Sequence, residues 1–115
     1  MIREAKQEDL LEVLNLYLYL HEETVPEQSE HLSVIWNQII ADKNHHLIVN
    51  IVDGKIVSSC VCVIIPNLTR NIHPYAFVEN VVTHADYRVH GYATECLNYA
   101  KTIAVNNNCY KMMLL

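Results

Sequence analysis

Apolar residues recur at intervals of three and four along three stretches of the chain, and this spacing predicts three amphipathic helices. The first covers about residues 7–20, where the acidic residues at its start suit a helix N-terminus. Pro26 breaks the chain after it. Ser29 is a suitable cap for the second helix. The third begins at Gly91 and ends near residues 106–108.

Runs of β-branched and apolar residues predict the strands. Residues 47–52 and 55–65 flank Asp53-Gly54, a dipeptide favoured in tight turns, and so predict a β-hairpin. A polar loop at 67–74 follows. The other predicted strands cover residues 2–5, 75–84 and 109–115. The order is therefore β-α-α-β-β-β-α-β, which predicts an α/β fold with a mixed sheet, ending in a strand, helix, strand unit of the length that a parallel crossover requires.

Size and composition limit the classes of function. With 115 residues, the whole chain 1–115 is expected to form a single domain, and 51% hydrophobic residues are typical of a folded protein. The net charge of -5 and the scattered lysines and arginines argue against a nucleic-acid partner. No apolar run approaches the roughly 20 residues that cross a bilayer, so we expect a soluble, cytoplasmic protein without a membrane partner.

The cysteines and histidines do not predict a metal site, because none has the spacing of a known ligand set. The cysteines lie in apolar segments and are predicted to be core thiols without disulfides: Cys60, Cys62, Cys96 and Cys109. Several histidines are predicted to be surface or loop residues: His45, His46, His84 and His90.

The most informative stretch runs from Glu79 to Ala93, where a predicted strand leads through a tight loop into a helix. Such a loop directs several backbone N–H groups and the positive end of a helix dipole at one point, which suits a phosphate or pyrophosphate. Gly91 would allow a ligand to approach the backbone closely. By itself, one glycine before a helix is weak evidence, and an ordinary strand-to-helix connection is the commoner arrangement.

Arg88-x-x-Gly91-x-Ala93 matches the Arg/Gln-x-x-Gly-x-Gly/Ala signature of the GNAT superfamily of N-acetyltransferases, at the strand-to-helix position where that family carries it. The element order is also similar, and the resemblance covers all 115 residues. The segments Glu79-x-Val81-Val82 and Cys109-Tyr110-Lys111 are similar to glucosamine-6-phosphate acetyltransferases and to a broad bacterial subgroup. The resemblance implies a GNAT-like acyl-CoA N-acyltransferase fold.

It also implies acetyl-CoA as co-substrate, with no metal, and transfer of its acetyl group to a primary amine on a small molecule, amino sugar or peptide. The pantetheine arm would insert into a splay between the fourth and fifth strands. By analogy, the residues of that strand that bind pantetheine are Val81, Val82 and Thr83. The residues that would wrap the pyrophosphate are Arg88, Val89, His90, Gly91, Tyr92, Ala93 and Thr94.

Three residues are candidates for contact with the acceptor amine. Glu79 is the candidate general base, because an amine arrives protonated and must lose a proton before it attacks a thioester. A carboxylate satisfied by backbone amides or by an arginine at the sheet surface is an equal alternative. Thr69 and Arg70 are candidates for binding an anionic part of the acceptor, although a solvated loop arginine is the commoner arrangement.

Two departures from the family pattern affect these expectations. Val89-His90 stands where relatives often have Gly-Lys, and a valine would be strained if the loop requires a positive φ there. The family also continues with a further helix and two strands, so we expect the chain to be truncated at its C-terminus and to form a homodimer or domain-exchanged assembly. A non-catalytic acyl-CoA-binding or regulatory protein and a generic α/β interaction domain are the alternatives.

Overall fold

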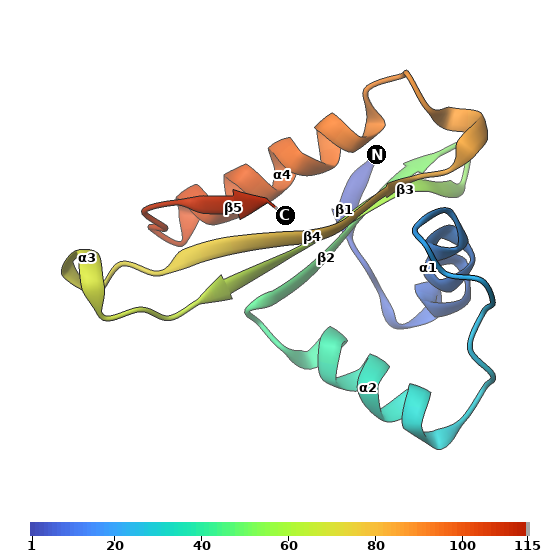
Figure 1. The fold of residues 1–115 in the computed structure, drawn as a ribbon, viewed down its shortest axis with the longest axis horizontal. Coiled ribbons are helices and arrows are strands. Elements are labelled where there is room, and N and C mark those ends of the chain that lie inside the picture. The colour runs from blue at the N-terminus through green and yellow to red at the C-terminus, as the bar shows by residue number, and fades with distance from the viewer. Residues whose placement is uncertain (115) are drawn as a thin grey trace.

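The computed structural model describes residues 1–114, which form a five-stranded sheet with helices on both faces (Figure 1). The strands are β1 (Ile2–Glu4), β2 (His45–Val52), β3 (Lys55–Ile65), β4 (Tyr75–Thr83) and β5 (Met112–Leu114). The α-helices are α1 (Leu10–Leu16), α2 (Glu30–Ala41), α3 (Thr69–Ile72) and α4 (Tyr92–Asn106). Apart from the four-residue α3 between β3 and β4, this order is the predicted β-α-α-β-β-β-α-β arrangement.

The strands follow one another in the sheet in the order β1-β2-β3-β4-β5. The first four are antiparallel, and Asp53-Gly54 forms the predicted turn between β2 and β3. β5 pairs with β4 in parallel, which requires the crossover that α4 provides. The described residues of β5 pair with β4 only at Ala76, Phe77 and Val78.

The alternation of side chains along β3 divides the core into two layers. Cys60 and Cys62 are fully buried against the face that α4 covers, whereas Val61 packs toward α1 and α2 on the opposite face. Figure 1 shows α4 on one side of the sheet and α1 with α2 on the other. The cysteines are free thiols, as predicted. Burial raises the pKa of Cys60 to about 12.

β4 contains a β-bulge at Asn80. Val61 pairs with Glu79 and Ser59 pairs with Val82, so two residues of β4 lie opposite the single residue between them in β3. Asn80 adopts a φ of 54°, a left-handed conformation that asparagine tolerates better than most residues. After the bulge, the side chains of β4 exchange faces.

The segment predicted as one helix over residues 7–20 is α1 with a 3-10 turn at each end, η1 (Gln7–Asp9) and η2 (Tyr17–Tyr19). Asp9 fixes its start, because its buried carboxylate accepts a 2.6 Å hydrogen bond from Nη1 of Arg3 and a 2.7 Å bond from the amide of Lys6. The bond from Arg3 lowers the pKa of Asp9 below its ordinary value.

Two other segments differ from their predictions. The expected loop at 67–74 contains α3, a short turn in which Arg70, Asn71 and Ile72 have positive φ values, a conformation with little signature in the sequence. The last strand begins at Met112 instead of residue 109, because Cys109 and Tyr110 donate backbone hydrogen bonds to Ala104 and Pro74 before the chain reaches β4. Leu115 lies outside the described residues.

Candidate functional site

The loop after β4 forms a hollow at the start of α4. His84 accepts a 3.1 Å hydrogen bond at Nδ1 from the amide of Asp86 and so caps the turn η3 (Ala85–Tyr87). The hollow that follows has a volume of about 240 Å³. Its lining includes six of the seven residues predicted to bind pyrophosphate, together with Thr83 and Tyr87; the six are Arg88, Val89, Gly91, Tyr92, Ala93 and Thr94. His90 is exposed and does not line it.

The backbone N–H groups of this loop are available to a ligand. Within residues 1–114, no amide between Arg88 and Thr94 donates a hydrogen bond to another protein group. The first amides of α4 have no partner in the helix itself, and they lie at the positive end of its dipole. Gly91 precedes α4 with a φ of 80°, which turns the chain into the helix. Such an N-terminus is a suitable site for an anion.

Arg88 and Val89 show how the loop is held. The guanidinium Nε of Arg88 lies 3.4 Å from the carbonyl oxygen of Thr83, so the side chain bends back over the end of β4. Val89 has a φ of 67° and is fully exposed. The strain predicted for a β-branched residue at this position is therefore present.

β4 connects this hollow with a second site. Thr83 lines the hollow, while Glu79 and the bulge residue Asn80 line a cavity of about 330 Å³. Between them, the carbonyl oxygen of Val82 accepts a 2.9 Å hydrogen bond from the Ser58 hydroxyl. At about 3.3 Å per residue, Asn80 and Thr83 are roughly 10 Å apart along the strand.

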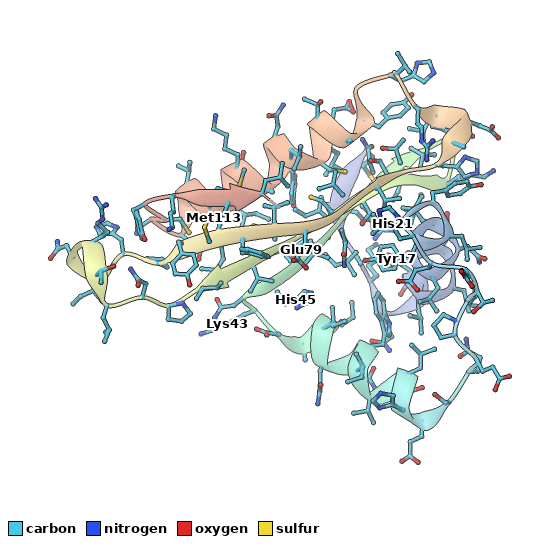
Figure 2. All side chains as sticks on the ribbon, in the orientation of Figure 1. Tyr17, His21, Lys43, His45, Glu79 and Met113 are labelled. Carbon is cyan, nitrogen blue, oxygen red and sulfur yellow. The ribbon has the colours of Figure 1, made fainter. Side chains whose placement is uncertain are left out.

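The floor of the cavity consists of two rows of side chains across the sheet. The rows follow from the register of β2, β3 and β4, and they are His45–Val63–Phe77 and Leu47–Val61–Glu79. The walls are two helical stripes that face this floor. They comprise Leu10, Val13, Leu14 and Tyr17 next to Leu32, Ile35, Trp36 and Ile39. Figure 2 shows Glu79, His45 and Tyr17 on the same side of the sheet as α1 and α2.

The polar groups of this cavity are few. Glu79 is exposed on β4. Burial raises the pKa of the Tyr17 phenol to about 12, so Tyr17 stays protonated at neutral pH. Burial lowers the pKa of His45, which favours its neutral form. The indole Nε1 of Trp36 donates a 3.0 Å hydrogen bond to the carbonyl of Gln7 and is thereby satisfied.

Sequence reasoning missed two residues of this cavity. His45 was predicted to be a surface or loop residue, but it begins β2 and is half-buried. Asn80, on β4, was assigned no role. The alternation of Phe77 and Glu79 was the available signal, since period-two residues share one face of a strand.

Thr69 and Arg70 lie away from both hollows. The hydroxyl of Thr69 accepts a 2.9 Å hydrogen bond from Asn67, and the guanidinium of Arg70 lies 5.4 Å from the ring centre of Tyr110. The segment that carries Thr69 and Arg70 precedes β4, which begins at Tyr75, and Glu79 is the fifth residue of that strand. The structure therefore does not bring Thr69 or Arg70 together with Glu79, and their contact with the acceptor stays a prediction.

Over the described part of the chain, no three His, Cys, Asp or Glu side chains form a group that could hold a metal ion. None of the helices in residues 1–114 has the length and apolar character needed to cross a membrane.

Comparison with known proteins identifies the family. The family model of the Acetyltransferase (GNAT) family matches residues 8–115. A protein from Agrobacterium tumefaciens str. C58, described as an acetyltransferase, is similar over 100% of this chain and 80% of its own, with 35% identity and a TM-score of 0.93. A transcriptional regulator from Bacillus halodurans C-125 matches with 25% identity, a TM-score of 0.84 and the same coverages of 100% and 80%.

The glucosamine-6-phosphate N-acetyltransferase from Arabidopsis thaliana has the same fold, with a TM-score of 0.90 at 20% identity over 100% of this chain and 80% of that one. These matches confirm the fold class and the resemblance inferred from Arg88, Gly91 and Ala93. The chain belongs to the GNAT acetyltransferase family.

Proposed function

We propose that this protein transfers the acetyl group of acetyl-CoA to a primary amine. The observation that supports the proposal is the set of free amides between Arg88 and Thr94, at the start of α4 and directly after β4. An array of N–H groups at a helix N-terminus fits a pyrophosphate. No atom lies within 4 Å of the space beside Gly91, which leaves room for a ligand at the backbone.

Acetyl-CoA supplies an activated acetyl thioester when it is bound. Backbone donors and the Arg88 guanidinium would hold its pyrophosphate. The residues that supply them are Arg88, Val89, His90, Gly91, Tyr92, Ala93 and Thr94. Val81, Val82 and Thr83 orient the pantetheine arm along the edge of β4. A main-chain N–H directed at the thioester oxygen stabilises the charge that develops there, a contribution of about 3 kcal/mol per donor in other enzymes.

Glu79 acts as the general base. Its carboxylate is exposed at the edge of the cavity, next to the bulge, where it can accept a proton from the ammonium group of the acceptor. Removal of this proton exposes the nitrogen lone pair, which is required for attack on the thioester carbonyl. The C–N bond would form as the C–S bond breaks, and the second proton lost by the nitrogen would neutralise the departing thiolate, which gives the amide and coenzyme A. The polar edge at Glu79 and Asn80 lies on the strand that leads to the pyrophosphate loop, so acceptor and donor would meet on β4.

Isothermal titration calorimetry with acetyl-CoA tests the donor. We expect binding by the natural chain and an affinity about tenfold lower for Arg88→Ala, since a charged hydrogen-bond donor is lost. Lys101→Ala is the matched control, because Lys101 is an exposed cation farther along α4 that does not line the hollow. Folded protein that binds no acetyl-CoA would refute the proposal.

Mass spectrometry of reactions with isotope-labelled acetyl-CoA and a panel of amines tests the transfer. Labelled acetyl amide supports the enzymatic function. Tight binding of acetyl-CoA without transfer to any amine would instead support a non-catalytic acyl-CoA-binding protein. The homodimer and the cytoplasmic location stay predictions, for which light scattering and cell fractionation are the measurements.

A further inference from the structure

We infer that the acceptor is a primary amine on an apolar body, of the alkylamine or arylalkylamine class. This inference rests on the proposed function and specifies the substrate of the same site. It is carried by the cavity between the sheet, α1 and α2, whose lining is mostly apolar and holds a single carboxylate, Glu79. Its volume of about 330 Å³ lies near the lower end of the range for small-molecule sites, roughly 300–1,000 Å³.

Part of the apolar lining belongs to the cavity and not to the buried core. Leu14, Ile35 and Phe77 line the cavity, yet they are not among the hydrophobic side chains packed into the core cluster on this face of the sheet. Ile35 is 40% exposed although it faces the sheet. An apolar ligand that covers these side chains removes their surface from water, which favours binding.

The charged residues of the lining favour a cationic group at the polar end of the ligand. Glu79 is the one carboxylate of the cavity, and no Lys or Arg of residues 1–114 contributes to its lining. An ammonium group at the Glu79 edge would therefore meet a complementary charge. A phosphate or carboxylate would find no cation in the cavity, since Lys43 is exposed in the turn before β2 and Arg70 lies against Tyr110.

Sugars are disfavoured by the same lining. Each sugar hydroxyl that enters must exchange its hydrogen bonds with water for protein partners, and an unpaired polar group is costly to bury. The polar side chains available are Tyr17, His45, Glu79 and Asn80, since the Trp36 indole already donates to Gln7. His45 lies on β2 and Glu79 with Asn80 on β4, at opposite corners of the cavity floor, and the rest of the floor between them is apolar. Four polar side chains spaced in this way are too few to pair with every hydroxyl of a polyhydroxylated ring.

Trp36 provides a direct assay that needs neither acetyl-CoA nor turnover. It is the only tryptophan of the chain, and it lines the cavity, so its fluorescence reports ligand binding there. We expect n-butylamine, n-pentylamine and n-hexylamine to bind with an affinity that rises about fourfold per buried methylene. Glucosamine and glucosamine 6-phosphate should change the fluorescence little at the same concentrations. An affinity that does not depend on chain length, or stronger binding of either sugar, would overturn the inference.

Two substitutions on α2 locate the binding. Ile35→Gln places an amide in the cavity wall and should reduce the affinity for n-hexylamine at least tenfold. Val34→Gln is the matched control, because Val34 is the preceding residue, is 46% exposed and does not line the cavity. Equal losses in both variants would contradict the assignment of the amine to this cavity.

The comparison of n-hexylamine with n-hexanol tests the charged end. The natural chain should prefer the amine, and Glu79→Gln should remove most of that preference while both ligands still bind. No preference in the natural chain would overturn the role of Glu79 in recognition. Calorimetry with acetyl-CoA remains a separate measurement, so a protein that acetylates only sugars or peptides would refute this inference and leave the acetyltransferase function intact.

Discussion

Val89 and Gly91 share the left-handed region of backbone conformation, with φ values of 67° and 80°, on either side of His90. Glycine adopts this region at little cost, whereas a β-branched residue does so only under strain. The loop before α4 therefore contains one residue suited to its conformation and one that opposes it. The two positions can be tested independently.

Replacement of Val89 by glycine should relieve the strain. We expect Val89→Gly to raise the free energy of unfolding by about 1 kcal/mol, because relief of the strained φ exceeds the entropy that a glycine adds to the unfolded chain. The affinity for acetyl-CoA should rise by a few fold. Urea denaturation and calorimetry are the measurements. Val89→Ala keeps a Cβ, so its free energy of unfolding should rise less. A Val89→Gly protein that is less stable than the natural chain would show that Val89 is not strained.

Replacement of Gly91 by alanine should have the opposite effect, and Gly54 offers a matched control. These are the only glycines of the chain, their φ values are 80° and 76°, and an added Cβ meets no atom within 4 Å at either position. Both substitutions should therefore cost about 1–2 kcal/mol of stability through the backbone alone.

Only Gly91→Ala should also weaken acetyl-CoA binding, by about tenfold, because residue 91 shapes the loop and residue 54 lies in the β2–β3 turn. Denaturation and calorimetry on both variants separate the two effects. Equal loss of affinity in the two proteins would indicate that the effect is one of global stability.

Glu79→Gln should lower turnover by about a hundredfold or more, since general bases contribute 10²–10⁴-fold to rates. The affinity for acetyl-CoA should change less than twofold. Steady-state kinetics across pH, with calorimetry in parallel, gives both quantities. Glu27→Gln, at an exposed position between α1 and α2, is the control for loss of a negative charge. Turnover that is unchanged at every pH would remove Glu79 from the mechanism.

The sequence was sufficient to predict features that depend on local patterns. Asp53-Gly54 predicted the hairpin turn, and the bounds of β3 were predicted as residues 55–65. The burial of Cys60 and Cys62 was predicted because alternation along a strand is a local property, whereas Cys109 was predicted to lie in the core and is only partly buried. Arg88, Gly91 and Ala93 predicted the loop before α4 since this signature is contiguous.

Features that depend on distant segments were not predicted. The bulge at Asn80 exists only through the register between β3 and β4, and a positive φ for asparagine is too common to indicate it. The cavity is lined by α1, α2 and three strands, so no single window of sequence contains it. His45 was misplaced because its neighbourhood resembles a loop until its pairing with Val63 is known.

Asp9 should make the protein sensitive to acid. The hydrogen bond from Arg3 lowers the pKa of Asp9 in the folded state, so its stabilising contribution is complete above the unfolded pKa of about 3.9 and is lost as the pH falls through the folded value. Asp9→Asn should cost about 2 kcal/mol at pH 7 and much less near pH 2. Urea denaturation at both pH values measures this difference.

Glu8→Gln is the control for the Asp9 experiment, because Glu8 is the adjacent residue and is exposed. It should leave the stability nearly unchanged. A penalty for Asp9→Asn that is the same at both pH values would show that the lost packing, and not the ionised pair, is responsible.

The cysteines should be protected from thiol reagents in the native protein. Burial raises the pKa of Cys62 and of Cys96 to about 11, and both are inaccessible, whereas Cys109 is only partly buried. A native titration with a chromogenic disulfide should detect at most one thiol, and four should react after denaturation. Cys109→Ser should abolish the native signal. Rapid reaction of more than one thiol in the native protein would contradict the burial of Cys60, Cys62 and Cys96.

The extra residue of β4 makes this strand more tolerant of changes in identity than of changes in length. Ala76 and Val78 pack toward α4, and a regular strand would send Val82 to the same face, but Val82 instead packs beside α1. A substitution between residues 80 and 83 alters one side chain. Removal of one residue would turn every following side chain to the opposite face, burying polar groups and exposing apolar ones. Homologous chains that vary in this strand should therefore differ by replacement and not by insertion or deletion.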